Sequence, residues 1–237
     1  MAERFDCYVS LGDSMSIDDY PGPGLGAASL LYRNADHEFP EFKGRDLASR
    51  FPGISFTHLA RDGATTREVQ DSLASLPPQP GRVLFSLTVG GNDLLRGRLR
   101  DLRGAIATYR ENLERILERI LRDYAGRCRV VQALIYDPTD GVGDLMAKGT
   151  PNPGLVAFLT SANAVITELA SGRPAVSVAD VHAHFLGHGS HASEGGNPHY
   201  SPADPSHWIK LGIEPNERGG SEVRRVLWDT LSEVEGW

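Results

Sequence analysis

The sequence predicts a single α/β domain in which helices cover both faces of a five-stranded parallel sheet. Strand-like apolar runs alternate with amphipathic segments almost throughout the chain. The strand-like runs are nearly continuously apolar, as expected of strands that are buried on both faces. A chain of 237 residues suits one such domain, which we assign to residues 1–237. Right-handed crossovers between five strands fit a doubly wound, flavodoxin-like strand order.

Periodicity and turn residues place the elements in order along the chain. Apolar, β-branched runs predict strands near residues 5–11, 54–60, 82–89, 128–136 and 175–181. Segments with apolar residues on one helical face predict helices near residues 41–50, 65–76, 101–123, 155–171 and 217–233. Three loops are longer than the sheet requires, and all three follow strands: residues 15–40, 137–153 and 182–216. Because the carboxyl ends of parallel strands share one edge, these loops can form the walls of a site.

Composition and charge argue against several classes of partner. The formal net charge of −7 argues against binding to a nucleic-acid backbone. Ten arginines lie between Arg96 and Arg129, but acids alternate with them at helical spacing, as in Glu111 with Arg115. We interpret this segment as a solvated helix face. No stretch approaches the roughly 20 apolar residues of a membrane helix, and the charged first residues do not resemble a signal sequence. We therefore expect a cytoplasmic protein without stable membrane insertion.

The two cysteines indicate free thiols rather than a disulfide. Cys7 and Cys128 begin the first and fourth predicted strands. If the third strand lies between these two, the cysteines are two strand spacings apart, about 9.6 Å, which is too far for a disulfide. Buried free thiols agree with a reducing compartment.

Polar side chains follow the predicted strands where α/β proteins keep their reactive groups. The first strand ends in Gly12-Asp13-Ser14 and the third in Gly90-Gly91-Asn92-Asp93. A serine hydroxyl becomes a useful nucleophile when a histidine removes its proton and donors face the developing oxyanion. Gly63, after the second strand, can present a backbone N–H, and Asn92 can add its side-chain amide. Asp204 and His207 are three residues apart, so Asp204 can orient the imidazole.

These four blocks together resemble the GDSL-type, or SGNH, hydrolase family. The matching residues are the serine of Gly12-Asp13-Ser14, Gly63, the asparagine of Gly90-Gly91-Asn92-Asp93, and the histidine of Asp204 to His207. The resemblance extends from residue 5 to about residue 230. It implies a three-layer α/β/α fold and hydrolysis of carboxylic esters without a cofactor. It also implies that Ser14, Gly63 and Asn92 supply the oxyanion hole.

The fourth block departs from the family pattern, in which Pro-Asn and a helix commonly follow the catalytic histidine. Here Pro-Asn follows Glu214, so an alignment on that segment puts Glu214 in the histidine position and Leu211 in the aspartate position. A carboxylate with a pKa near 4.3 is a weak base for a serine, although it could orient a histidine from the preceding loop. We take His207 as the base and Asp204 as its partner. The alternative is another loop histidine, such as His184 or His188.

Two further hypotheses remain open. The six histidines of the last long loop could hold a divalent metal for a metal-dependent hydrolase: His182, His184, His188, His191, His199 and His207. Their spacing matches no familiar zinc motif, and this hypothesis leaves the Gly-Asp-Ser block unexplained. Because the fourth block is irregular, the scaffold could instead bind an acyl or sugar ligand and turn it over weakly or not at all.

The function predicted is ester hydrolysis through an acyl-enzyme on Ser14, with a small-molecule ester as substrate. A short acyl ester, an acetylated sugar and a lysophospholipid all suit the same catalytic parts, because loops select the ligand. The loop that continues from Asp18 to Tyr32 mixes glycines with apolar residues, so it either covers the acyl pocket or is anchored to the core by Leu30 and Leu31. The sequence pattern contains no signal for oligomeric state.

Overall fold

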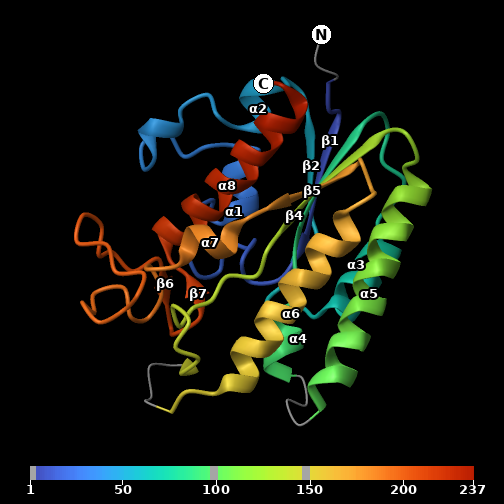
Figure 1. Ribbon diagram of the computed structural model, residues 1–237. Coiled ribbons are helices and arrows are strands. Elements are labelled where there is room, and N and C mark those ends of the chain that lie inside the picture. Colours follow the sequence, from blue (N-terminus) through green and yellow to red (C-terminus); the bar gives the residue numbers. More distant parts are fainter. Residues whose placement is uncertain (1–3, 97–100, 146–149) are drawn as a thin grey trace.

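The computed structural model describes residues 4–96, 101–145 and 150–237. Its central feature is a five-stranded parallel sheet with the order β2-β1-β3-β4-β5 (Figure 1). The strands are β1 Cys7–Gly12, β2 Ser55–His58, β3 Val83–Thr88, β4 Cys128–Ala133 and β5 Val176–Ala179. All five lie inside or within a residue of the predicted ranges. The predicted fold class and strand order are therefore confirmed.

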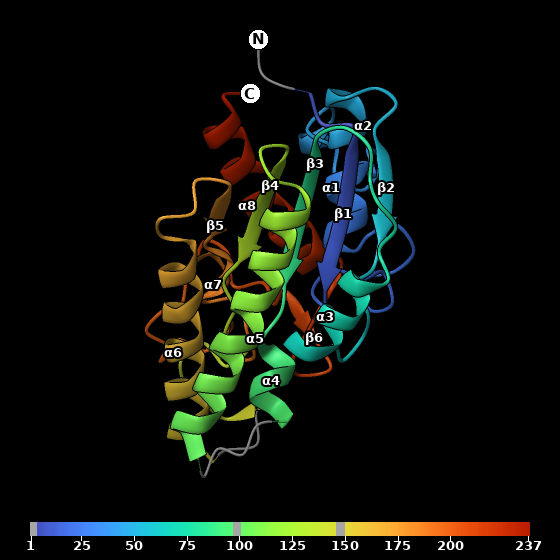
Figure 2. The ribbon, with the colours of Figure 1, turned by 90° about the vertical axis from the view of Figure 1, so that its right-hand side faces the viewer.

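Helices cover both faces of the sheet, as Figures 1 and 2 show. One face carries α3 Thr66–Ala74, α4 Gly91–Arg96, α5 Leu102–Asp123 and α6 Pro153–Ala170. The other carries α1 Ala27–Tyr32, the short 3₁₀ helix η1 Pro40–Phe42, α2 Leu47–Arg50, α7 Val181–Phe185 and α8 Glu217–Glu235. Successive residues of a strand point to opposite faces. Thus Val9 and Phe85 belong to the core beneath α5 and α6, whereas Tyr8 and Leu84 belong to the core beneath α1 and α8.

The long amphipathic helices agree with the prediction, and the short elements were missed. The helices α3, α5, α6 and α8 occupy the predicted segments within a few residues. The helix expected at residues 41–50 is instead split into η1 and α2, and Asp46 caps α2 by accepting a hydrogen bond from the Ser49 N–H at 2.8 Å. The unpredicted elements are α1, α4, α7 and a small hairpin formed by β6 Ile209–Lys210 and β7 Glu214–Pro215. Elements of two to six residues are too short to show a period.

The cysteine and arginine interpretations agree with the structure. Cys7 pairs with Val83, and Val83 pairs with Cys128, so β3 separates the two cysteines, and both thiols are free. Cys7 is buried as predicted, whereas Cys128 is only half-buried. On α5, the Arg115 guanidinium lies 2.6 Å from the Glu111 carboxylate, and both side chains are exposed. Exposed pairs of this kind contribute little to stability, so the face is a solvated one.

Helix α6 is long and apolar enough to cross a membrane by length and composition, a feature that the sequence interpretation passed over. In the structure it is a core helix. Phe158, Ala162 and Ile166 are fully buried on one side of it, against the sheet and α5. An apolar helix whose buried face packs in the core of the domain needs no membrane to explain that composition.

The first long loop is anchored to the core. Leu30 and Leu31 are both fully buried in α1. Leu30 packs with Phe39 and Phe42 in a small satellite cluster, and Leu31 packs in the core beneath α8. The anchoring alternative is therefore the one that the structure supports for these two leucines.

Candidate active site

The end of β1 presents Ser14 through a turn that requires glycine. Gly12 has φ +150°, and a Cβ atom there would lie 2.2 Å from Thr88 Oγ1, so no larger residue fits. The Asp13 N–H donates to the Thr88 carbonyl at 2.9 Å, and Asp13 Oδ1 accepts from the Met15 N–H at 3.1 Å. This Asx-type turn fixes the backbone around Ser14, which is 9% exposed.

The ends of β2 and β3 meet beside that turn. Gly63 follows β2 with φ +67°, a conformation that favours glycine. Asn92 lies in the first turn of α4, directly after β3, and its Nδ2 donates to the Ala64 carbonyl at 3.3 Å. Asp93 accepts hydrogen bonds from the N–H of Thr66 at 2.9 Å and so ties α4 to the start of α3. Ser14, Gly63 and Asn92 therefore follow three adjacent strands at one edge of the sheet.

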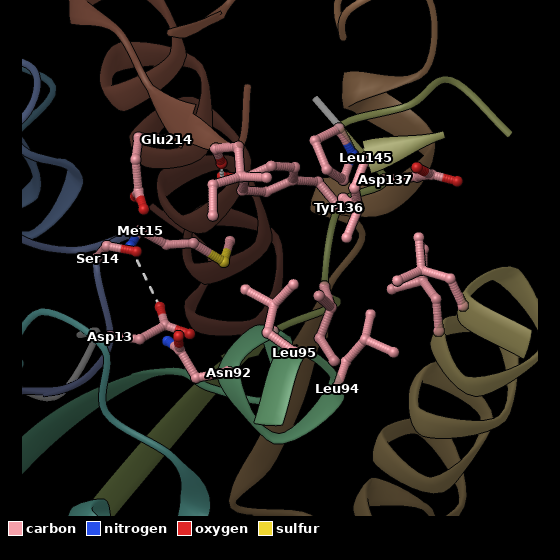
Figure 3. A pocket seen from close by; sticks show the side chains of 16 residues that line it. Asp13, Ser14, Met15, Asn92, Leu94, Leu95, Tyr136, Asp137, Leu145 and Glu214 are labelled. Carbon is pink, nitrogen blue, oxygen red and sulfur yellow. Dashed lines mark hydrogen bonds between the residues drawn. The ribbon is translucent and has the colours of Figure 1, made fainter. Parts of the chain in front are cut away.

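A cavity of about 60 Å³ opens from Ser14 between α4, α6 and the β6–β7 hairpin (Figure 3). Its polar end contains Asp13, Ser14, Asn92 and Glu214. Away from Ser14 its walls are apolar, and they are formed by Leu94, Leu95, Ile135, Leu145, Leu155 and Leu159. A nucleophile at the mouth of an apolar cavity is an arrangement that suits an ester with a hydrocarbon acyl group.

Glu214 is the acidic residue that the hairpin brings to Ser14. It lies in β7, is 8% exposed, and points its carboxyl group toward Ser14 (Figure 3). Burial raises the pKa of Glu214, the Ser14 side chain partly opposes that effect, and the charge of Asp62 adds to it. Among the described residues, Glu214 Oε2 has no hydrogen-bond partner. The side-chain hydrogen bond from Ser14 that lowers the pKa of Glu214 shows that the two groups interact directly.

The hairpin is fixed in this position by residues on both sides. The hydroxyl group of Tyr136, which follows β4, donates to the Ile213 carbonyl. The Asn216 N–H donates to the Trp208 carbonyl at 2.9 Å, and Asn216 Oδ1 caps α8 by accepting from the Gly219 N–H. The Pro-Asn segment therefore starts α8 and sets Glu214 at the rim of the cavity.

The structure does not bring the predicted base and its partner to Ser14. Asp204 accepts hydrogen bonds from the Ser206 N–H and hydroxyl, and the Ser206 hydroxyl lowers the pKa of Asp204. His207 is exposed, is absent from the cavity lining, and donates from Nδ1 to the Gly189 carbonyl at 2.8 Å. Asp204 thus forms its hydrogen bonds within the Asp-Pro-Ser turn and not with His207. The chain from His207 to Glu214 forms most of the β6–β7 hairpin, which puts Glu214 beside Ser14 instead.

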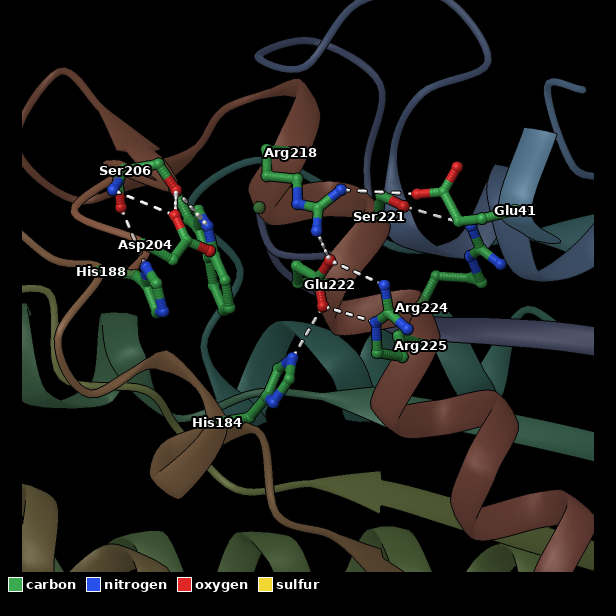
Figure 4. A network of polar contacts seen from close by, with 12 residues as sticks. Glu41, His184, His188, Asp204, Ser206, Arg218, Ser221, Glu222, Arg224 and Arg225 are labelled. Atoms are coloured by element: carbon green, nitrogen blue, oxygen red, sulfur yellow. Dashed lines mark hydrogen bonds and ion pairs between the residues drawn. The ribbon is translucent and has the colours of Figure 1, made fainter. Parts of the chain in front are cut away.

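Four of the other loop histidines have side-chain partners of their own. His184 Nε2 lies 2.7 Å from Glu222 of α8 (Figure 4). The His188 ring stacks on Trp208 with 3.5 Å between ring centroids. His182 donates from Nδ1 to the Ile135 carbonyl, and His191 contacts Asp144 and Glu194. Within the described ranges no three His, Cys, Asp or Glu side chains are grouped so that they could hold a metal ion. The metal-site hypothesis therefore has no support in the geometry.

Comparison with known proteins identifies the family. The model of the GDSL-like lipase/acylhydrolase family matches residues 10–219, and the chain belongs to this family. Family membership makes the chain a carboxylic ester hydrolase by class, acting on small-molecule esters. No curated protein sequence matches the chain.

Solved structures of the same fold cover nearly the whole chain. A lipolytic protein of the G-D-S-L family from Veillonella parvula has a TM-score of 0.61 and 16% identity, covering 95% of this chain and 98% of its own. An extracellular lipase from Streptomyces rimosus has a TM-score of 0.59 and 21% identity, with coverages of 94% and 99%. A mutant acetyl-xylooligosaccharide esterase from Geobacillus has a TM-score of 0.61 and 13% identity, with coverages of 100% and 97%. At these identities the likeness shows the fold.

Proposed function

We propose that the protein hydrolyses short-chain carboxylic esters through an acyl-enzyme on Ser14, with Glu214 in place of histidine as the general base. One observation carries the proposal: the described residues that line the cavity at Ser14 include no histidine, and the Glu214 carboxyl group points at the serine (Figure 3). Burial raises the pKa of Glu214, which makes its carboxylate a stronger base than an exposed one. Carboxylates are in general weaker bases than imidazole, so we expect slow turnover.

The reaction has two balanced halves. Ser14 Oγ attacks the ester carbonyl carbon as its proton passes to Glu214, and the tetrahedral intermediate collapses when the Glu214 proton moves to the leaving alcohol. Water then attacks the acyl-enzyme and gives its proton to Glu214, and that proton returns to Ser14 as the acid departs. Glu214 ends each cycle as a carboxylate and Ser14 as an alcohol.

The oxyanion donors in this proposal are the backbone N–H groups of Ser14 and Gly63 and the side chain of Asn92. Within the described part of the chain, neither backbone N–H donates to a protein acceptor. The Asn92 amide carries two N–H bonds and donates one to the Ala64 carbonyl, so the other can reach the substrate. Donors that are already in place need no reorganisation during the reaction, and each contributes about 3 kcal/mol in comparable sites.

The size of the cavity supports a short acyl group. About 60 Å³ accommodates roughly four water-sized groups at ~15 Å³ each. Leu155 and Leu159 of α6 are among the apolar residues that line the cavity. Acetyl to butyryl chains therefore fit, whereas a fatty acyl chain would extend out of the cavity.

The test is a panel of nitrophenyl esters of rising acyl length with the wild type and three variants. We expect activity to fall beyond butyrate, Ser14→Ala to abolish turnover, and Glu214→Gln to reduce kcat about 100-fold or more. His207→Ala, the matched imidazole control, is expected to keep its activity within about twofold of the wild type. If Glu214→Gln kept its activity and His207→Ala lost it, the general base would be His207 rather than Glu214. Failure of a fluorophosphonate probe to label Ser14 in folded protein would favour a ligand-binding scaffold.

A further inference from the structure

A second carboxyl group, that of Asp13, lines the same cavity beside Ser14 and is 2% exposed. Its Oδ1 accepts from the Met15 N–H at 3.1 Å and from Thr88 Oγ1 at 3.4 Å. The other oxygen, Oδ2, lies 4.0 Å from the point where a Cβ atom of Gly91 would stand, and no described residue donates a hydrogen bond to it. The turn therefore uses one oxygen of Asp13 and leaves the other at the cavity wall.

The groups that face Asp13 from the surrounding elements are acidic or neutral. They are Glu214 from β7, Asp93 from α4, Tyr109 from α5 and Tyr136 from the segment after β4. Among the described residues, no lysine, arginine or histidine forms an ion pair with Asp13 within 4.0 Å. An ionised carboxylate in such a place is unfavourable, because burial removes most of its contact with bulk water and no described cation pairs with the charge.

The side chain therefore tends to keep its proton. Burial raises the pKa of Asp13 to about 7, and the negative charges of Glu214 and Asp93 act in the same direction. Because a protonated carboxyl group is a hydrogen-bond donor, Oδ2 can donate into the cavity, next to the Asn92 amide (Figure 3).

We propose that Asp13 is a further catalytic residue: in its protonated form it donates a hydrogen bond from Oδ2 to the oxygen that becomes negative when Ser14 attacks. This inference rests on the proposed function and adds a fourth donor to the oxyanion site. The proton stays on Asp13 throughout, so the step consumes no acid. A neutral Asp13 also lets Glu214 remain ionised, since two close carboxyl groups resist ionising together.

Glu214 and Asp13 together would restrict ester hydrolysis to a range of pH. Turnover needs Glu214 ionised and Asp13 protonated, so activity rises with pH as Glu214 loses its proton and falls again near pH 7 as Asp13 loses its own. The acidic limb lies above the ordinary value of 4.5, because burial raises the pKa of Glu214. A histidine base would give the opposite alkaline behaviour, with activity that rises through neutral pH and then levels off.

The experiment is the pH dependence of kcat/KM for nitrophenyl acetate from pH 4.5 to 9 in the wild type, Asp13→Asn and Glu214→Gln. At pH 8.5 only about 3% of a group with a pKa near 7 keeps its proton, so we expect wild-type kcat/KM about thirtyfold below its maximum. Asn donates at every pH but more weakly, so Asp13→Asn should lower the maximum about three- to tenfold and lose the alkaline limb. Asp62→Asn is the matched control, because it removes another carboxylate that acts on Glu214, and it should keep the alkaline limb.

The outcomes separate the inference from the proposed function. An alkaline limb that persists in Asp13→Asn, or a wild-type profile that is flat above pH 7, overturns the role of Asp13. If the acidic limb persists in Glu214→Gln, Glu214 is not the base. The role of Asp13 is then decided separately, by the alkaline limb of Asp13→Asn. If no ester is turned over, infrared difference spectra between pH 5.5 and 8.5 decide the protonation directly. A protonated carboxyl band that is present at pH 5.5 and missing in Asp13→Asn supports the inference, and its absence from the wild type overturns it.

Discussion

Two regions supply the candidate active site, and they are fixed in different ways. The strand-edge region holds Ser14, Gly63 and Asn92, which follow β1, β2 and β3 at positions set by the sheet register. The late loop, residues 182–216, lies outside the sheet and is held by side-chain contacts and one small hairpin. In the first region a motif fixes the position of its residues. In the second a motif such as Asp-x-x-His does not, because the chain can turn anywhere between the strand and α8.

The largest effect is expected from a change in the strand-edge region. Gly12→Ala puts a methyl group 2.2 Å from Thr88 Oγ1 and 2.3 Å from the Thr88 carbonyl oxygen, which is backbone and cannot rotate away. We expect loss of more than about 3 kcal/mol of stability and of all measurable esterase activity. Thermal unfolding by circular dichroism checks the first effect, and nitrophenyl acetate turnover checks the second. Gly126→Ala is the control for positive φ alone, because a Cβ there meets nothing within 4 Å. A stable, active Gly12→Ala protein would show that the turn can be rebuilt.

The buried Asp13 carboxyl group is expected to lower the stability of the strand-edge region near neutral pH. Because burial raises the pKa of Asp13 from 3.8 to about 7, folding becomes less favourable as pH rises between those values and stays so above them. At ~1.4 kcal/mol for each pH unit the penalty reaches about 4 kcal/mol. Asp13→Asn should therefore gain up to that amount in urea unfolding at pH 8 and little at pH 3.5. If Asp13→Asn changed the free energy of unfolding equally at both pH values, the pKa of Asp13 would not be raised in the folded protein.

The same difference between the two regions explains which parts of the fold and site could be predicted from the sequence. The strands, their order and the placement of Ser14, Gly63 and Asn92 followed from apolar runs and from the rule that parallel strands end at one edge. The hairpin was missed because four paired residues carry no period, and with it the approach of Glu214 to Ser14. The Glu-Pro-Asn segment was the available signal for Glu214. Asp13 carries a motif signal only as part of Gly-Asp-Ser, and its protonation depends on neighbours that only folding assembles.

The third prediction tests what anchors the late loop to α8. Glu222 is 1% exposed and lies among His184, Arg218 and Arg225 (Figure 4). Burial alone would raise the pKa of Glu222, but hydrogen bonds from His184 and Arg225 hold it down at about 2. The carboxylate thus stabilises the fold above the ordinary value of 4.5, and the contribution is lost as pH falls toward 2.

Glu222→Gln should therefore lose about 3 kcal/mol at pH 7 and almost nothing at pH 2. Urea unfolding at the two pH values measures the difference. Glu217→Gln, on the exposed first turn of the same helix, is the matched control with an expected change of under about 0.5 kcal/mol. Because the Glu222 cluster does not line the cavity, the ratio of short-ester to long-ester turnover should stay the same in both variants. A changed ratio would mean that α8 also sets the position of Glu214.

The smallest expected effect concerns the link between the late loop and the cavity wall. His191 is nearly buried and joins Asp144, next to the lining residue Leu145, to Glu194 of its own loop. Burial would lower the pKa of His191, but the hydrogen bonds to Asp144 and Glu194 raise it overall above 6.5. The stabilisation is complete below the unfolded value and is lost as pH rises through the folded one.

His191→Asn should remove this dependence and lower thermal stability by a few degrees at pH 6 but less at pH 8.5. His199→Asn is the matched control, because the His199 ring forms no hydrogen bond or ion pair with a described residue. Differential scanning fluorimetry at the two pH values resolves shifts of this size. If His191→Asn and the wild type lose the same stability between pH 6 and pH 8.5, the imidazole is not charged in the folded protein. The contact between the two loops is then a hydrogen bond from a neutral imidazole.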